Sequence, residues 1–198
     1  MQNQTGKTAL LILDIQNGIV SQFNNTTTIL SKISNLINAA RQNHIFVIFV
    51  RVGFDKGYPE INPQNKFFSA IPALDRMTIL DKETQIHESI SPKANEPIIT
   101  KYRFSAFSGS NLELILRSQQ INTLILSGIS TSGVVLSTVR EAADKDFILK
   151  VISDACFDRD PEVHRILTEK IFPNQAEVLT SNDWIQSLNS TNDYKIEK

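Results

Sequence analysis

The sequence predicts an α/β domain in three layers, with a six-stranded parallel sheet between two layers of helices. Two observations support this prediction. Short runs rich in Ile, Val and Leu, with little polar alternation, are typical of strands that are covered on both faces. Longer segments of helical period separate these runs, and such alternation is typical of a parallel sheet with right-handed crossovers. The predicted architecture is therefore Rossmann-like.

Six apolar runs are expected to form the strands. They are Ala9–Leu13, Ile45–Val52, Pro97–Thr100, Thr123–Leu126, Phe147–Ile152 and Ala176–Leu179. Four apolar stripes predict helices. They consist of Ile29, Ile33, Leu36, Ile37 and Ala40; of Leu112, Ile115 and Leu116; of Val135, Leu136, Val139 and Ala142 or Ala143; and of Val163, Ile166, Leu167 and Ile171. Asp160-Pro161-Glu162 is a favourable helix start, because a capping carboxylate precedes Pro at the first helical position.

Composition limits the classes of partner. The chain has 198 residues, of which 41% are hydrophobic, and a formal net charge of -1. This balance gives no electrostatic reason to expect nucleic acid or a membrane surface as partner. The single cysteine, Cys156, excludes an intrachain disulfide, and no apolar stretch approaches the ~20 residues that span a bilayer. Because the N-terminus does not resemble a secretory signal, we expect a cytoplasmic protein.

One domain over residues 1–188 is the simplest organisation, followed by a polar and frayed C-terminal tail over 189–198. Residues 53–84 show no clear period. A loop of this length is usually functional or disordered, so a lid or subunit contact and a plain surface excursion both stay open.

Three features follow predicted strands and are expected at one edge of the sheet. Asp14 ends the first strand, Lys101 ends the third, and Gly128 leads from the fourth strand into a helix. Ligands of open parallel sheets bind at this edge, where strand order reverses. Burial would raise the pKa of Asp14, and Lys101 would stabilise developing negative charge. Backbone N–H groups after Gly128 would add donors, and Gly133 would leave room for a ligand.

These residues also carry a family resemblance. Asp14–Asn17, Lys101–Phe107 and Gly128–Val135 resemble the three signature blocks of the isochorismatase-like hydrolases, a superfamily of isochorismatases, nicotinamidases and related cysteine hydrolases. The resemblance spans nearly the whole chain. It implies that Asp14 and Lys101 are catalytic and that a non-proline cis peptide bond follows Ile129. It also implies that the nucleophilic cysteine of amide-hydrolysing members is replaced here by Val134.

Val134 limits the chemistry, because a valine has no lone pair to attack a substrate. Cys156 is expected to be a buried, inert thiol. Ser130, Thr131 and Ser132 are better explained as helix caps than as substitute nucleophiles, since no histidine lies in these blocks. Nicotinamidases carry metal-binding histidines after the second strand, and the matching stretch here has none, so no metal or other cofactor is expected.

Further residues are candidates for substrate binding. They are Gln16, Phe23, Arg103, Phe104, Ile129, Ser130 and Gly133. Arg51 is, like Arg103, a candidate for bidentate binding of an anionic substrate. Tyr58 and Phe107 could join Phe23 and Phe104 in an aromatic wall, and core packing explains each of these rings at least as well. Two hypotheses stay open: a cysteine-independent hydrolase of a small, anionic substrate, with vinyl-ether cleavage as in isochorismatases as one reaction, and a non-catalytic relative that binds a small ligand or a protein. The resemblance also implies a homodimer or homotetramer.

Overall fold

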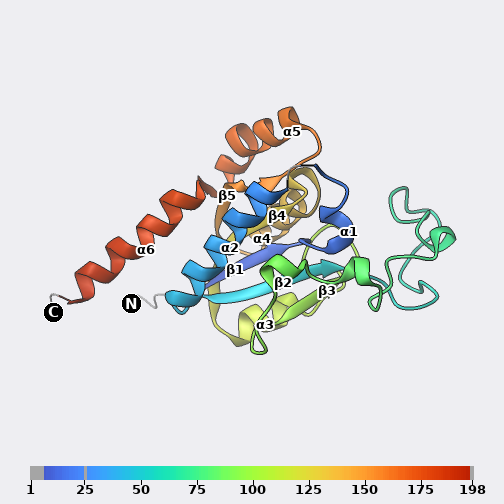
Figure 1. The fold of residues 1–198 in the computed structure, drawn as a ribbon, viewed down its shortest axis with the longest axis horizontal. Helices are drawn as coiled ribbons and strands as arrows, with labels where there is room; N and C mark the ends of the chain where they lie inside the picture. Colours follow the sequence, from blue (N-terminus) through green and yellow to red (C-terminus); the bar gives the residue numbers. More distant parts are fainter. Residues whose placement is uncertain (1–6, 25, 197–198) are drawn as a thin grey trace.

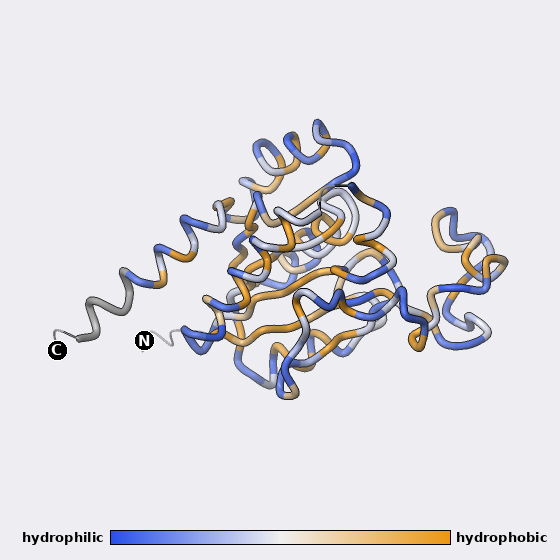
Figure 2. The backbone as a smooth tube through the Cα atoms, in the orientation of Figure 1, coloured by the Kyte–Doolittle hydropathy of each residue, from blue (hydrophilic) through white to orange (hydrophobic). Residues whose placement is uncertain are grey.

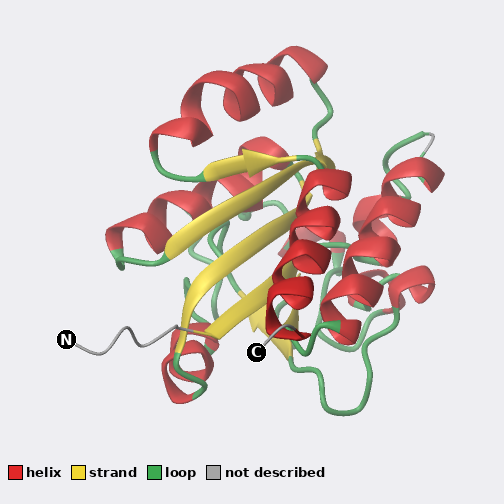
Figure 3. Ribbon diagram, turned by 90° about the vertical axis from the view of Figure 1, so that its left-hand side faces the viewer, coloured by secondary structure: helices red, strands yellow, loops and turns green. Residues whose placement is uncertain are grey.

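The computed structural model describes residues 7–24 and 26–196. Its centre is a six-stranded parallel sheet with the strand order β3-β2-β1-β4-β5-β6. Figures 1 and 3 show this sheet among the surrounding helices. The strands are β1 (Lys7–Leu13), β2 (Phe46–Val52), β3 (Ile98–Lys101), β4 (Ile121–Ile129), β5 (Ile148–Phe157) and β6 (Glu177–Leu179). Each strand overlaps the apolar run that predicted it, so the predicted sheet is confirmed. The order of the strands reverses between β1 and β4.

In the described part of the chain, six α-helices and six shorter helical turns accompany the strands, and the last helix follows the last strand. The α-helices are α1 (Asn17–Val20), α2 (Thr27–Gln42), α3 (Leu112–Ser118), α4 (Leu136–Asp144), α5 (Pro161–Ile166) and α6 (Ser181–Ile196) among the described residues. The turns are η1 (Pro72–Leu74), η2 (Lys82–Thr84), η3 (Glu88–Ile90), η4 (Thr131–Val135), η5 (Leu167–Ile171) and η6 (Phe172–Asn174). Asp160 caps α5 as predicted, since its side chain accepts hydrogen bonds from the backbone of Glu162 and Val163.

Helix α6 differs from the expectation of a frayed tail over 189–198, because its backbone stays helical as far as Ile196. Figure 1 shows that this end of the helix leaves the body of the molecule. The first turns are held by Trp184, which is 2% exposed and packs under the sheet, with Ile185 and Leu188 beside it. The rest of the helix is polar in composition and has no apolar stripe, so no helical pattern predicted it.

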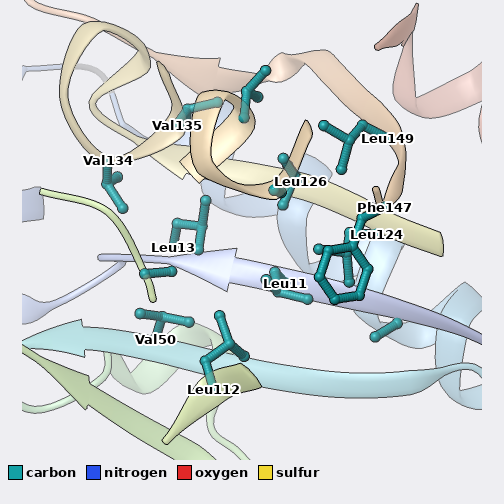
Figure 4. Close-up of a cluster of buried hydrophobic side chains, with 14 of the residues drawn as sticks. Leu11, Leu13, Val50, Leu112, Leu124, Leu126, Val134, Val135, Phe147 and Leu149 are labelled. Atoms are coloured by element: carbon teal, nitrogen blue, oxygen red, sulfur yellow. The ribbon is translucent and has the colours of Figure 1, made fainter. Parts of the chain in front are cut away.

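Side chains alternate between two hydrophobic cores, one on each face of the sheet. In β1, Leu11 and Leu13 point into the core beneath α3 and α4, whereas Leu10 and Ile12 point into the core beneath α2 and α6. Figure 4 shows the first core, and Figure 2 shows the hydrophobic strands enclosed between more polar segments. Cys156 lies in the first core and belongs to β5. The predicted strand ended at Ile152 and would have placed Cys156 after it. The three-layer arrangement is thus confirmed.

The segment 53–84 extends beyond the carboxyl ends of the strands (Figure 1). It contains the turns η1 and η2 and one isolated β-bridge, between Phe54 and Thr78. Its side chains Phe54, Tyr58, Phe68 and Ile71 form a third, small core together with Val52 at the end of β2. In the described part of the chain, no helix combines the length and the apolar character needed to cross a membrane.

Candidate active site

Asp14 and Lys101 meet at the carboxyl edge of the sheet, as predicted. The Lys101 Nζ lies 2.9 Å from Asp14 Oδ2, and the side chains are only 3% and 7% exposed. Asp14 directly follows β1 and Lys101 ends β3, so β2 lies between the two strands that carry the pair. The backbone of Asp14 has a φ of 56°, in the left-handed region where Asp is one of the better-tolerated residues.

The surroundings of the pair change the acidity of Asp14. Burial raises the pKa of Asp14, and the charge and hydrogen bond of Lys101 oppose that rise without cancelling it. Asp14 Oδ1 is buried and has no hydrogen-bond partner among the described residues. Lys101 Nζ also donates a hydrogen bond of 2.9 Å to the backbone oxygen of Arg103. Asp14 therefore holds a proton more readily than an ordinary carboxyl group, and Lys101 is fixed beside it.

A cavity of about 350 Å³ opens next to this pair. It is lined by Asp14, Ile19, Gln22, Phe23, Val52, Phe67, Phe68, Ile71, Met77, Lys101, Phe104, Ile129, Ser130, Ser132, Gly133, Val134, Asp158 and Arg159. Phe104 contacts the rings of Phe67 and Phe68, with centroid separations of 4.7 and 5.4 Å. The cavity thus combines one polar, buried end with an aromatic wall, as small-molecule sites usually do.

The turn after β4 forms another side of the cavity. A Cβ on Gly128 would lie 2.3 Å from the backbone oxygen of Leu13, so only glycine allows β4 this close to β1. The peptide bond between Ile129 and Ser130 is cis, as the family resemblance implied. Ser130 caps the following helical turn by accepting a hydrogen bond from the Gly133 N–H, which agrees with the capping role expected for it.

Val134 stands in the first helical turn after β4 and is 2% exposed. It lines the same cavity as Asp14 and Lys101, at the place that the resemblance assigns to the nucleophile. Cys156 does not line this cavity. It is buried, and burial raises the pKa of its thiol to about 12. The single thiol of the chain is therefore protonated and enclosed, as expected for a structural cysteine.

Gln16 does not line the cavity, contrary to its expected role in substrate binding. Its amide is fully buried and used by the protein itself. The side-chain oxygen accepts from the Val52 N–H at 2.9 Å, and the side-chain nitrogen donates to the carbonyl oxygens of Val52 and Thr84 at 2.8 and 2.9 Å. Gln16 thus joins the end of β1 to the end of β2 and to the segment 53–84.

Arg103 and Arg51 also lie outside the cavity, although both were candidates for binding an anionic substrate. The Arg103 guanidinium donates to the backbone oxygens of Tyr102 and Glu60 at 2.6 and 2.8 Å. Arg51 donates to Thr100 and to Gln85. Both guanidinium groups are thereby used to hold the chain around the site. Their proximity in sequence to strand ends did not reveal which way the side chains point.

The other candidates divide between wall and core. Phe23, Phe104, Ile129, Ser130 and Gly133 all line the cavity. Tyr58 and Phe107, by contrast, are buried in hydrophobic cores and do not line the cavity. In the described residues, no three His, Cys, Asp or Glu side chains are grouped as metal ligands would be.

Two charged residues that line the cavity, Asp158 and Arg159, were not predicted. They directly follow β5, whose carboxyl end lies beside that of β4. Asp158 is buried, and its Oδ2 accepts a hydrogen bond of 2.7 Å from the Ser132 N–H. This backbone N–H is therefore already hydrogen-bonded within the protein. It is not available to a substrate, although we expected the backbone N–H groups of this turn to be available. An end of β5 placed at Phe157 would have pointed to both residues.

His164 was also missed as a neighbour of the site. Its Nδ1 lies 2.8 Å from the hydroxyl of Thr131, and burial lowers the pKa of the imidazole while Asp158 opposes this shift. Thr131 is fully buried and does not line the cavity. The contact therefore ties α5 to the turn after β4 and leaves Thr131 without access to a ligand.

Comparison with known proteins agrees with this geometry. A model of the isochorismatase domain matches residues 8–183. The uncharacterized isochorismatase family protein YwoC of Bacillus subtilis is 29% identical over 183 residues, which are 92% of this chain and 94% of that protein. Ureidoacrylate amidohydrolase RutB of Stutzerimonas stutzeri is 29% identical over 181 residues, covering 80% of this chain and 73% of that protein.

A solved structure shows the same fold. The isochorismatase family protein from Burkholderia thailandensis superposes with a TM-score of 0.81 at 26% identity, covering 92% of this chain and 96% of that one. The matched family model spans the sheet, the ion pair and the turn after β4. The chain belongs to the isochorismatase family, whose members include hydrolases.

Proposed function

We propose that this chain hydrolyses a small organic molecule with Asp14 as the general acid and base, Lys101 as its electrostatic partner, and no covalent intermediate. The observation that supports this proposal is the buried ion pair at one end of the cavity. A carboxyl group with a raised pKa keeps its proton to higher pH than an ordinary carboxyl group, which suits it to act as a proton donor. The ammonium group, 2.9 Å away, stabilises the carboxylate that remains after the proton has left.

Val134 argues against a covalent pathway. The relative RutB is named as an amidohydrolase. Amide cleavage through an acyl-enzyme needs a nucleophilic atom in the pocket. The Val134 side chain offers none, and Cys156 is enclosed in the core. With no thiol in the pocket, we infer that water attacks the substrate directly. This requirement favours substrates that become reactive toward water once they have been protonated.

Vinyl ethers are such substrates. Protonated Asp14 delivers its proton to the terminal alkene carbon, and the π electrons form the new C–H bond. The resulting oxocarbenium ion adds water, and Asp14 takes back one proton from that water. The hemiketal then loses the alcohol and leaves a ketone. The net change is the addition of one water molecule, and Asp14 returns to its protonated state.

Substrate turnover tests this proposal. The purified protein is assayed with alkyl and aryl ethers of enolpyruvate, with amides and with esters, and Asp14→Asn is compared with Asp144→Asn. Asp144 is exposed at the end of α4, outside the cavity, so its variant controls for the loss of one carboxylate. We expect ether cleavage to fall by about 10²- to 10⁴-fold in Asp14→Asn and to persist in Asp144→Asn.

The competing function is ligand binding without turnover, and the apolar side chain of Val134 favours it. Saturable binding by both the wild type and Asp14→Asn, with no product from any substrate class, would establish this function in place of hydrolysis. Equal turnover by the wild type and Asp14→Asn would instead refute the role of Asp14 as the acid. Urea unfolding of each variant shows whether the protein remains folded.

A further inference from the structure

Arg159 brings to the cavity a positive charge that has no ion-pair partner among the residues the structure describes. Lys101 and Arg159 are the cations among the residues that line the cavity. Lys101 is already paired with Asp14. Arg159 is exposed, and no carboxylate lies within ion-pair distance of it in the described part of the chain. A charged group that faces a substrate cavity without a protein partner is available to bind a ligand of opposite charge.

The neighbouring carboxylate is turned away from Arg159. Asp158 Oδ2 accepts from the Ser132 N–H at 2.7 Å, and Asp158 Oδ1 accepts from the Asp160 N–H at 3.3 Å. Both oxygens are thus held by backbone donors of the turns after β4 and β5. This explains why the adjacent residues in the chain do not form an ion pair that would neutralise the guanidinium.

Two contacts hold Arg159 in place. Its guanidinium carbon lies 5.8 Å from the centroid of the Phe23 ring, and Phe23 is itself packed edge-on against Phe157 at 5.1 Å. One guanidinium nitrogen donates to Gln22 Oε1 at 3.4 Å, while Gln22 Nε2 donates to the Gly18 carbonyl at 2.9 Å. A guanidinium has five N–H donors, so these contacts leave a pair free for a bidentate partner.

We propose that Arg159 determines substrate specificity, by binding a carboxylate of a substrate whose apolar body lies against the phenylalanines of the cavity. This inference rests on the proposed function and adds the chemical class of the substrate. A planar guanidinium matches a carboxylate in geometry and charge. A single unpaired cation balances one negative charge, which favours a monocarboxylate over a dianionic phosphate. The substrate would extend from Asp14, where the chemistry takes place, to Arg159.

Direct binding measurements test this inference without relying on turnover. The probes are 3-phenylpropionate and the neutral 3-phenylpropionamide, titrated into the intact protein by isothermal calorimetry. We expect the wild type to prefer the carboxylate by about tenfold, the lower end for a hydrogen bond to a charged group. Arg159→Gln should abolish this preference while keeping its affinity for the amide. Arg159→Lys should restore part of it, and added salt should weaken it in the wild type.

Arg140→Gln serves as the matched control, because it removes the same charge from an exposed arginine that contacts Gln175 outside the cavity. This variant should keep the wild-type preference. The inference is overturned if the wild type shows no preference for the carboxylate, including no binding of either probe, or if Arg159→Gln and Arg140→Gln behave alike. If the preference depends on Arg159 but no substrate is turned over, the inference holds and the hydrolase proposal fails.

Discussion

Replacing Lys101 by Met is the most informative perturbation of the buried ion pair. The two side chains have similar length, so the change removes the ammonium group and keeps most of the packing. Asp14 would then lose its only hydrogen-bonding partner among the described side chains, because Asp14 Oδ1 already has none. The carboxyl group is 7% exposed and gains little from solvent. The variant therefore isolates a carboxylate in an environment that disfavours its charge.

The expected loss of stability follows from the geometry of the pair. Two unit charges 2.9 Å apart attract one another by about 6 kcal/mol at an effective dielectric constant of about 20. Desolvation offsets part of this attraction in the intact pair. Removing one partner of a buried pair typically costs about 3–5 kcal/mol, because the other charge is left uncompensated. We expect a loss within that range at pH 8, a large part of the stability of an ordinary domain.

The loss should depend on pH with a defined sign. Burial raises the pKa of Asp14 in the folded state above the ordinary value of 3.8, so the folded protein holds this proton more tightly than the unfolded chain. The associated stability is present below the unfolded pKa and is lost as pH rises through the folded pKa. Lys101 lowers the pKa of Asp14, so Lys101→Met extends this decline to higher pH. The variant should be closest to the wild type in mild acid.

Urea unfolding of the wild type, Lys101→Met and the double variant Asp14→Asn/Lys101→Met, from pH 5 to pH 8.5, measures this effect. The double variant has no ionisable group at position 14, so its loss of stability should change little with pH. A loss in Lys101→Met that is equally independent of pH would refute the reasoning. So would a loss below about 1 kcal/mol throughout, since that is the size expected for an exposed ion pair.

Two further substitutions test the turn after β4. Val134→Cys should place a thiol in the cavity near Lys101, and iodoacetamide should modify it at least about tenfold faster than Cys156, whose thiol has a pKa of about 12. Peptide mass mapping, with the wild type as the Cys156 reference, measures both rates, and equal rates would contradict an activating pocket. Gly128→Ala should cost about 3 kcal/mol or more in urea unfolding, because the new Cβ would lie 2.3 Å from a backbone oxygen. Gly53→Ala is the milder control, since its Cβ meets a side-chain atom at 3.3 Å; similar losses in both would contradict this explanation.

The sheet was predictable because its strands are buried on both faces. In β1 every residue from Ala9 to Leu13 is fully buried. A strand that is buried on both faces consists of consecutive apolar residues, and this run is visible in the sequence. Strand ends were less predictable. The run at Thr123–Leu126 belongs to a strand that continues to Ile129, and β5 continues to Phe157 through Ser153 and Asp154. Polar residues inside a strand interrupt the apolar signal even where the backbone pairing goes on.

The candidate site was predictable where position along a strand decides the outcome. Asp14 and Lys101 converge because parallel strands end at a common edge, and this follows from topology alone. The roles of Gln16, Arg103 and Asp158 depend on the direction of a side chain relative to its neighbours. Gln16 turns to the backbone of β2, and Arg103 to the carbonyl oxygen of Glu60. Such directions are set by tertiary contacts that a single sequence does not encode in any local pattern.

The cavity combines two kinds of structure with different consequences for function. Asp14 and Lys101 stand on strand ends that the whole core holds in place, so their separation is fixed by the fold. Phe67, by contrast, lies in the segment 53–84 and is 63% exposed although it lines the same cavity. Few core contacts constrain such a residue, so its replacement costs little stability. It follows that substitutions in the buried ion pair affect the stability of the fold, whereas this part of the aromatic wall is free to vary without loss of the fold.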